Sequence, residues 1–99
     1  MTPAKALALQ LFSESAAIED VIHQTGRTRP TVVEYLCDYI ARDRPASITT
    51  WIAPDLYQRI AAAVQQHGSG KLKPLFIALG EKVPYDDIRV VVTHLTKDQ

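Results

Sequence analysis

The segment TGRTRPT, residues 25–31, places two arginines and several hydroxyl side chains around a single glycine. The guanidinium groups of Arg27 and Arg29 can bind phosphates or the edge of a guanine, and Thr28 and Thr31 can donate hydrogen bonds to phosphate oxygens. This chemistry suits contact with a nucleic acid. It requires that the segment be an exposed turn, so the elements on either side decide the interpretation.

Apolar residues recur at helical spacing on both sides of the segment. The first side predicts a helix over residues 16–24, capped by Ser13 or Ser15 and ended by Gly26, which tolerates a positive φ. The second predicts a helix from its cap at Thr28 to about residue 41. The predicted inward residues of the two helices are Ile18, Val21, Ile22, Val32, Leu36, Tyr39 and Ile40.

Two helices joined by a tight, glycine-containing turn are typical of a helix-turn-helix unit. In such units the second helix lies in the major groove of DNA and its first residues reach the base edges. Two acidic residues, Glu34 and Asp38, would face or border the DNA, so base-specific recognition is not expected. The predicted DNA-binding residues are Arg27, Thr28, Arg29, Thr31, Tyr35, Arg42 and Arg44.

The rest of the chain predicts more helices. A helix starts at Thr2 and Pro3 and runs to about residue 13 with Leu7, Leu11 and Phe12 inward, and others start at Pro54, near residue 71 and at Pro84. The β-branched residues at 48–50, beside Trp51, indicate a short extended piece. The predicted fold is all-α: one domain, residues 1–99, of about six short helices, with the helix-turn-helix in the N-terminal half and a small helical bundle after it. A winged-helix-like form stays open, and no internal repeat is evident.

The overall charge limits any role in DNA binding. Eleven basic and eleven acidic residues give a net charge of zero, and the pI is near 6.8. Because affinity for DNA depends on neutralising phosphates, a neutral chain predicts weak binding through locally placed charges, or tethering to a larger DNA-binding protein. The single cysteine and the absence of an apolar run of about 20 residues favour a cytoplasmic protein without a membrane span.

Other candidates for chemistry have simpler explanations. GSGKLK lacks the spacing of a phosphate-binding loop, and the three histidines lack partners at metal-ligand spacing. Adjacent carboxylates at Asp86 and Asp87 suit a helix N-terminus, and Cys37 suits a buried, inert position. No catalytic residue, metal or cofactor is therefore predicted in this chain, and it is not expected to be an enzyme.

Two further groups of residues stay open. Trp51, Tyr57 and Tyr85 could stack on bases, although aromatic residues spread among helices more often lie at the edge of a core. Lys71, Lys73 and Arg89 could form a second basic patch, although a solvated surface is the preferred interpretation.

Nearly the whole chain resembles the helix-turn-helix module at the C-terminus of RecQ-type ATP-dependent DNA helicases. The resemblance lies in ALALQLFSESAAIEDVIHQTGRTRPTVVEYLCDYI, with its "G-x-T/S-x-x-T-V/I" turn, and in KLKPLFIALGEKVPYDDIRVVVTHL, which is similar to "L-K-P-I-x-x-A-L…I-x-Y-x-x-I-R-x-V". The second block is the more specific. The chain departs from the family at Ile22, where alanine is usual, and at residues 42–44, where a glycine is common.

The resemblance implies that this chain is the accessory domain of a bacterial helicase that acts in DNA repair and recombination. The motor domains, in the same polypeptide, would bind ATP and magnesium. This domain would then be a cytoplasmic, nucleoid-associated monomer that binds DNA weakly and helps the motor engage it. The alternative is a protein-interaction or regulatory module that does not contact DNA, which the neutral charge, Glu34 and Asp38 favour.

Overall fold

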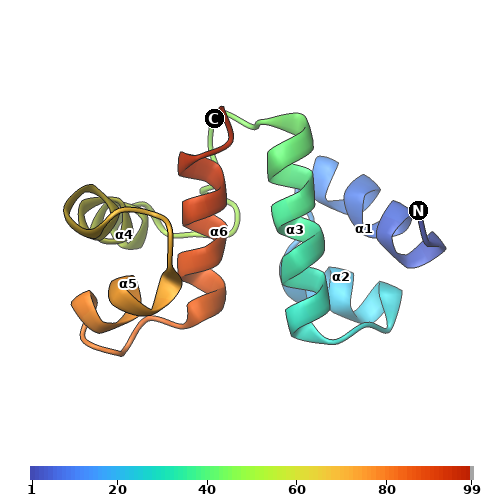
Figure 1. Cartoon of the computed structure of the whole chain (residues 1–99). Coiled ribbons are helices and arrows are strands. Elements are labelled where there is room, and N and C mark those ends of the chain that lie inside the picture. Colours follow the sequence, from blue (N-terminus) through green and yellow to red (C-terminus); the bar gives the residue numbers. More distant parts are fainter. Residues whose placement is uncertain (99) are drawn as a thin grey trace.

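The computed structural model describes residues 1–98 and shows six α-helices and no β-strand among them (Figure 1). The all-α prediction is confirmed, and the winged-helix-like alternative does not apply, since no β-hairpin follows the third helix within the described residues. None of these helices is both long and apolar enough to cross a membrane. The helices are α1 (Pro3–Ser13), α2 (Ile18–Thr25), α3 (Arg29–Asp43), α4 (Pro54–His67), α5 (Leu72–Ala78) and α6 (Tyr85–Leu95).

Hydroxyl caps and prolines explain where several helices begin. Thr2 caps α1 by accepting a hydrogen bond from the amide of Lys5 at 3.2 Å, and prolines occupy the first turns of α1, α3 and α4, where no amide donor is needed. The predicted cap of α2 at Ser13 or Ser15 is wrong, because α2 starts after Ala17. The hydroxyl of Ser13 instead donates to the carbonyl of Gln10, and Ser15 takes a positive φ of 65° in the connecting turn.

Burial overrides local preference at two further places. The predicted extended piece at residues 48–51 is a turn, in which the amides of Trp51 and Ile52 both donate to the carbonyl of Ile48 at 3.0 Å. This turn places Ile48 and Ile52 in the core, so packing decides against an extended conformation. Leu7, expected to face inward, is exposed, whereas its neighbours Ala8 and Leu9 are buried.

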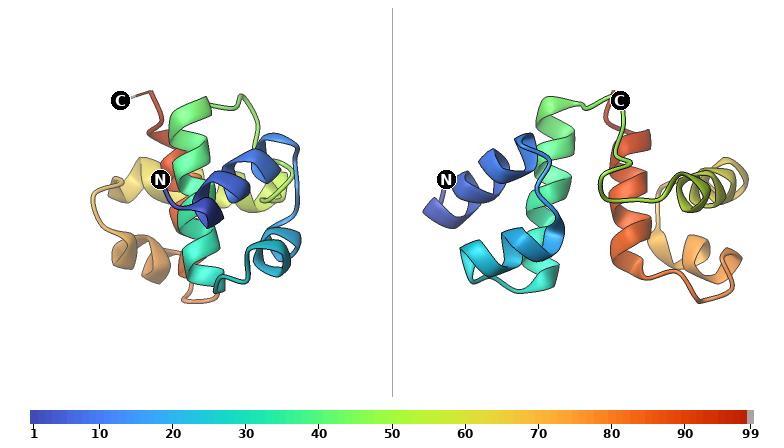
Figure 2. Two further views of the ribbon diagram at one scale, coloured as in Figure 1. Left: turned by 90° about the vertical axis from the view of Figure 1, so that its right-hand side faces the viewer. Right: turned by 180° about the vertical axis from the view of Figure 1, so that it is seen from behind.

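The six helices form two units of three helices with the same order and packing. In each unit the first and second helices pack on each other and both pack on the third: α1, α2 and α3 in the first unit, and α4, α5 and α6 in the second. The right-hand view of Figure 2, seen from behind, shows the two units on opposite sides of the molecule. Residues 44–53 join them on the side that faces the viewer there. The C-terminal half is thus a second helix-turn-helix-like unit rather than an unrelated bundle.

A few positions of the two units also correspond in sequence, although this does not amount to an internal repeat. Ile18, Val21, Gly26 and Pro30 are each separated by the same number of positions from Leu72, Leu75, Gly80 and Pro84, respectively. The corresponding residues are mainly the apolar face of the second helix and the glycine after it. The turn of the second unit is also longer: residues 79–84 connect α5 to α6, whereas residues 26–28 connect α2 to α3.

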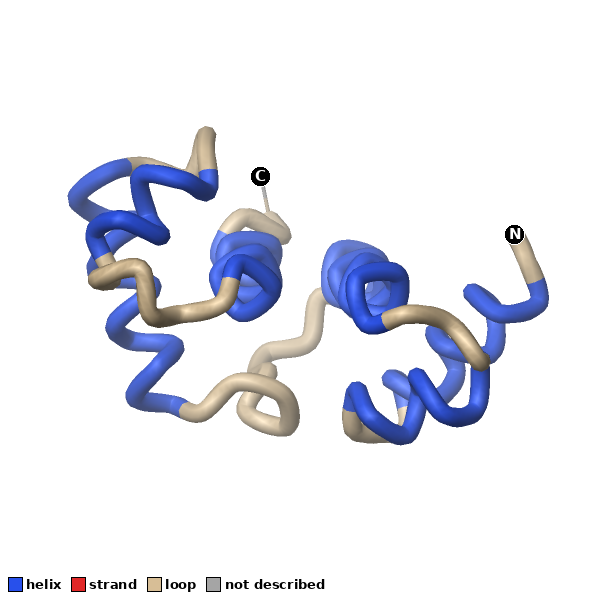
Figure 3. The backbone as a smooth tube through the Cα atoms, turned by 90° about the horizontal axis from the view of Figure 1, so that it is seen from below, coloured by secondary structure: helices blue, strands red, loops and turns tan. Residues whose placement is uncertain are grey.

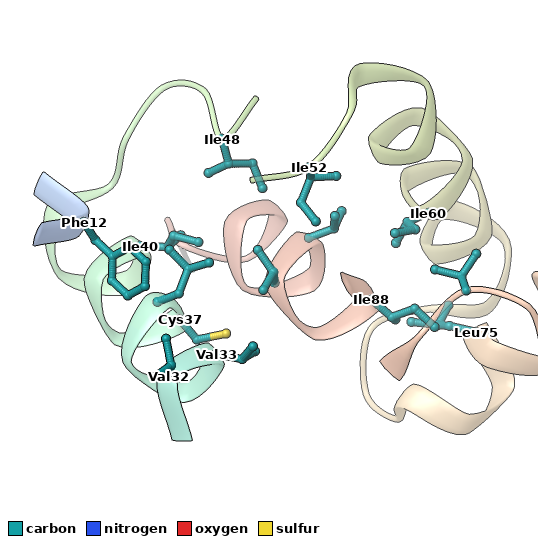
Figure 4. Packing of buried hydrophobic residues seen from close by; sticks show 14 of the residues in the cluster. Phe12, Val32, Val33, Cys37, Ile40, Ile48, Ile52, Ile60, Leu75 and Ile88 are labelled. Carbon is teal, nitrogen blue, oxygen red and sulfur yellow. The ribbon is translucent and has the colours of Figure 1, made fainter. Parts of the chain in front are cut away.

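Among the described helices, only α3 and α6 pack across the two units. They run parallel, with their N-terminal ends at the bottom of Figure 1, and Figure 3 shows them side by side at the centre of the molecule. Figure 4 shows Val33 and Cys37 of α3 on the side of the helix that faces α6, with Ile48 above them. The core is therefore continuous, with the α3–α6 contact at its centre.

Candidate nucleic-acid interface

The turn between α2 and α3 has the geometry that the sequence predicts. Gly26 takes a left-handed conformation at φ 68°, and its amide donates to the carbonyl of Ile22 at 2.9 Å, which ends α2. Thr28 is the extended residue before α3, so the predicted start of this helix is confirmed. Its side chain makes no capping bond to the backbone and instead donates to the hydroxyl of Thr31 at 3.2 Å. The segment is exposed, as a contact surface requires.

The two arginines of this turn differ in their surroundings. Arg29 forms an ion pair and a hydrogen bond with Glu19 of α2, which raises the pKa of its guanidinium group. Both side chains remain at least half exposed, so the pair is a surface interaction of little energetic weight. Arg27 is exposed and forms no ion pair with any residue among 1–98. Of the two arginines, Arg27 is therefore more available to bind a phosphate.

Acidic residues of the second unit lie close to Arg29. The charges of Asp86 and Asp87, in the first turn of α6, both act on Arg29. Burial raises the pKa of the Asp87 carboxyl, while Arg29 opposes that rise. The two helix N-termini therefore lie side by side, and the end of the molecule that carries Arg27 and Arg29 has mixed charge.

The side of α3 offers little surface for a major groove. Asp38, expected to border the DNA, forms an ion pair with Lys5 of α1 at 3.1 Å, and Tyr35 is half-buried. With α1 and α2 on one side of α3 and α6 on another, the exposed residues along its middle include Glu34 and no basic side chain. Helix α3 can therefore present its N-terminal end to a nucleic acid more readily than its length.

The predicted DNA-binding residues do not form one patch. Arg42 and Arg44 lie at the C-terminal end of α3, about 20 Å from Arg29 at a rise of about 1.5 Å per residue. Arg42 is hydrogen-bonded to Asp43, and Arg44 ends the helix with a positive φ of 50°, a conformation that favours glycine. Only Arg27, Thr28, Arg29 and Thr31 come together, at the other end.

His94 is a buried polar residue whose role the sequence does not reveal. Its Nε2 lies 2.8 Å from the carbonyl oxygen of Pro45, and its Nδ1 lies 2.7 Å from the hydroxyl of Tyr57. Because a carbonyl can only accept, Nε2 carries a proton, and in this tautomer Nδ1 accepts the hydrogen bond that the Tyr57 hydroxyl donates. The ring joins α6 to α4 and to residues 44–53. These two contacts give His94 a structural role, because they connect three segments that are far apart in the sequence.

The remaining candidates also have structural positions. Cys37 is buried between α3 and α6, and burial raises the pKa of its thiol, as expected for an inert cysteine. Trp51 donates from Nε1 to the carbonyl of Ala16 at 2.8 Å and packs edge-on against Phe12 and Tyr39. Within residues 1–98, no three His, Cys, Asp or Glu side chains come together as a metal site would require.

The excess of positive charge lies in the second unit, whereas the sequence favours the first unit as the DNA contact. Residues 1–43 carry more acidic than basic side chains, and residues 44–98 carry the reverse. Arg59 is exposed on α4, Lys71 just before α5 and Lys73 on α5. Arg89 is half-buried on α6, where its charge acts on Cys37, so it does not join these residues in a patch.

Comparison with known proteins identifies the family. Residues 4–92 match a protein-family model described as a helix-turn-helix domain. No curated protein and no solved structure matches the chain. The match runs from α1 to near the end of α6, so it includes both three-helix units. Because the match spans most of the sequence, the chain belongs to this family of helix-turn-helix domains.

Proposed function

We propose that this domain binds DNA weakly, without base specificity, through the N-terminal end of α3. The observation that carries the proposal is the group formed by the exposed Arg27, Thr28 and Arg29 and the half-buried Thr31 beside the turn of a helix-turn-helix unit. Two guanidinium groups and a helix N-terminus favour phosphate oxygens. The nearby Asp86 and Asp87 explain why the affinity should be low, and the phosphate contacts of the two arginines explain why it should fall with salt.

The test is fluorescence anisotropy with labelled duplex, single-stranded and forked DNA at low and moderate salt. We expect binding at low salt, and we expect Arg27→Ala and Arg29→Ala each to weaken it and to reduce the slope of log K against log salt by about one per lost phosphate contact. Arg42→Ala and Arg44→Ala are matched controls, because they remove the same charge at the opposite end of α3.

Two results would overturn the proposal. One is no DNA binding at low salt. The other is an equal loss of affinity in all four arginine variants, which would mean that net charge, rather than the end of α3, governs binding. Glu19→Gln should have the opposite effect on affinity. It releases Arg29 from its ion pair and should strengthen DNA binding.

We also propose that the domain serves as a monomeric accessory part of a RecQ-type ATP-dependent helicase in the bacterial cytoplasm. The resemblance of LKPLFIALGEKVPYDDIR to the closing block of that helicase module supports this parent. The motor, outside this chain, would hold ATP and magnesium, and no catalytic role is proposed for the domain itself. Immunoblotting with an antibody to the domain tests the parent. We expect a polypeptide several times larger, and a band no larger than this chain would refute it.

The alternative is a protein-interaction or regulatory module, and one observation favours it. The sides of α3 that a major groove would contact are occupied by α1, α2 and α6, and the middle of its exposed face carries Glu34. Under this alternative, the domain would bind the motor or another protein, and DNA binding would be absent at every salt concentration. Mixing the isolated domain with the purified motor in sedimentation experiments would detect that complex.

A further inference from the structure

A shallow apolar groove on the second unit has no role in the DNA contact proposed at α3. It lies along the outer side of α5 and the end of α4, has a volume of about 480 Å³, and is lined by His67, Lys71, Lys73, Pro74, Ile77 and Ala78. Ile77 is 55% exposed, which is unusual for such a large aliphatic side chain. Neither α4 nor α5 contacts α3, so this surface is separate from the end of α3.

Positive charge surrounds this groove. Lys71, Lys73 and His67 are exposed, no acidic residue lines the groove, and neither lysine forms an ion pair within the described part of the chain. An aliphatic floor with unpaired cations at its edge complements a ligand that has an apolar side chain next to negative charges.

The first unit shows that the fold does not require this surface. Counting back by the interval that relates Gly80 to Gly26, the equivalents of Lys73, Pro74 and Ile77 are Glu19, Asp20 and His23. These three residues are exposed and polar. The exposed isoleucine and the lysines are therefore particular to the second unit, and packing of a three-helix unit does not account for them.

The composition of the groove selects among possible ligands. A single-stranded nucleic acid would bring phosphates to the lysines, but the groove has no Phe, Tyr or Trp on which its bases could stack, and the imidazole of His67 is its only aromatic ring. A second copy of this chain offers the acidic pair Glu19 and Asp20, but their exposed neighbour His23 supplies no apolar side chain. It also offers Tyr85 beside Asp86 and Asp87, but these two aspartates are half-buried and their charges already act on Arg29. An acidic peptide with an aliphatic or aromatic side chain satisfies both features.

We propose that the groove lined by Lys71, Lys73 and Ile77 binds an acidic segment of another protein, with one apolar side chain of that segment seated on Ile77. The lysines pair with carboxylates on either side of this anchor. The site is independent of the proposed DNA contact, because it uses residues of α4, α5 and the loop between them alone.

The experiment uses the whole chain and two dye-labelled peptides. In the first, a single leucine is flanked by aspartates; in the second, serine replaces that leucine. We expect the first peptide to bind at low salt and the second to bind at least tenfold more weakly, because only the first buries an apolar side chain on Ile77. Amide shifts in the NMR spectrum of the labelled domain should be confined to residues 67–78.

Amino-acid substitutions test whether the peptide binds at this groove. Ile77→Asp should abolish binding of the leucine peptide, and Lys71→Glu and Lys73→Glu should each lower its affinity several-fold. His23→Asp is the matched control at the equivalent position of the first unit and should leave binding unchanged. Ile77→Ser gives the same expectation as Ile77→Asp with less risk to folding, and circular dichroism of each variant verifies the helices.

Several outcomes would overturn the proposal: no binding of the leucine peptide at low salt, equal binding of the two peptides, or unchanged binding by Ile77→Ser. Preferential binding of a labelled single-stranded oligonucleotide at residues 67–78, or a dimer of the free chain that Ile77→Ser dissociates, would assign the groove to a different ligand. Arg27→Ala and Arg29→Ala should leave peptide binding intact, so failure here is distinguishable from failure of DNA binding.

Discussion

Gly26 and Gly80 occupy equivalent turns of the two units and have nearly the same backbone angle, φ 68° and 76° respectively. Each follows the second helix of its unit and redirects the chain toward the third. An L-amino acid with a side chain is disfavoured at such angles, whereas glycine is not. The two helix ends differ in detail, because Gly26 is itself the C-cap of α2, whereas Leu79 caps α5 with a φ of −89° and Gly80 follows it.

Replacing either glycine with alanine should destabilise the chain through backbone strain alone. A Cβ built on Gly26 or Gly80 meets no atom within 4 Å, so no clash adds to the strain. We expect each variant to lose about 1 kcal/mol of unfolding free energy and to lower the Tm by about 4–8 °C. Gly70→Ala is the matched control: its surroundings are equally open and its φ is not positive, so it should be neutral or slightly stabilising. Equal losses in all three variants would contradict this account.

The hydrogen bond from Tyr57 to His94 predicts a cost for Tyr57→Phe. Removing the hydroxyl leaves the buried Nδ1 of His94 without a donor. Residues 46–49, Tyr57 and His94 line a cavity of about 220 Å³, and water entering there can replace part of the lost bond. We therefore expect thermal or urea unfolding to show a loss of about 1–2 kcal/mol. Tyr85→Phe, at an exposed tyrosine stacked on Phe76, should change stability little. A similar loss in both variants would refute the role of the His94 bond.

The boundaries of helices were predictable wherever one residue type has one dominant effect. Proline starts α4 at Pro54 and glycine ends it at Gly68, and both positions follow from the sequence. The turn at residues 48–51 was not predictable, because β-branched residues by themselves favour an extended strand. The turn forms because it buries Ile48 and Ile52 in the core. The cap expected at Ser13 or Ser15 was not predictable either. The Ser13 hydroxyl bonds the carbonyl of Gln10 in the helix that precedes it, and local pattern does not distinguish this bond from a cap on the next helix.

The candidate site was predictable only in part, since charge placement depends on tertiary packing. The start of α3 directly after Thr28 and the exposure of Arg27 and Arg29 follow from the local pattern. The approach of Asp86 and Asp87 to Arg29 does not, because it results from the parallel packing of α3 and α6. The same holds for the contacts of His94 with Tyr57 and Pro45, which lie far away in the sequence.

The thiol of Cys37 should be unreactive in the folded chain. It is buried between α3 and α6, burial raises its pKa, and the nearby Thr93 hydroxyl only partly offsets this rise. At neutral pH we expect reaction with a disulfide reagent to be slow and limited by opening of the α3–α6 contact. The denatured chain provides the reference rate for an exposed thiol. Fast reaction of the native chain would show that α3 and α6 separate readily.

Two aspartates with oppositely shifted pKa values, Asp87 and Asp43, predict opposite effects of pH on stability. Burial raises the pKa of Asp87 in the folded state, so its contribution to stability is lost as pH rises through that pKa, and Asp87→Asn should stabilise the chain at neutral pH. The hydrogen bond from Arg42 lowers the pKa of Asp43. The contribution of Asp43 is therefore lost as pH falls through its lowered pKa, and Asp43→Asn should not stabilise the chain at neutral pH.

Titration of the carboxyl groups by NMR tests the underlying geometry directly. Asp87 should titrate at a higher pH than Asp43, and Arg29→Ala should raise the pKa of Asp87 further, because the Arg29 charge opposes the effect of burial. Arg42→Ala, at the other end of α3, should raise the pKa of Asp43 and leave that of Asp87 unchanged. If Arg29→Ala did not move the pKa of Asp87, the two helix N-termini would not lie side by side, and the low affinity expected at Arg27 and Arg29 would need another cause.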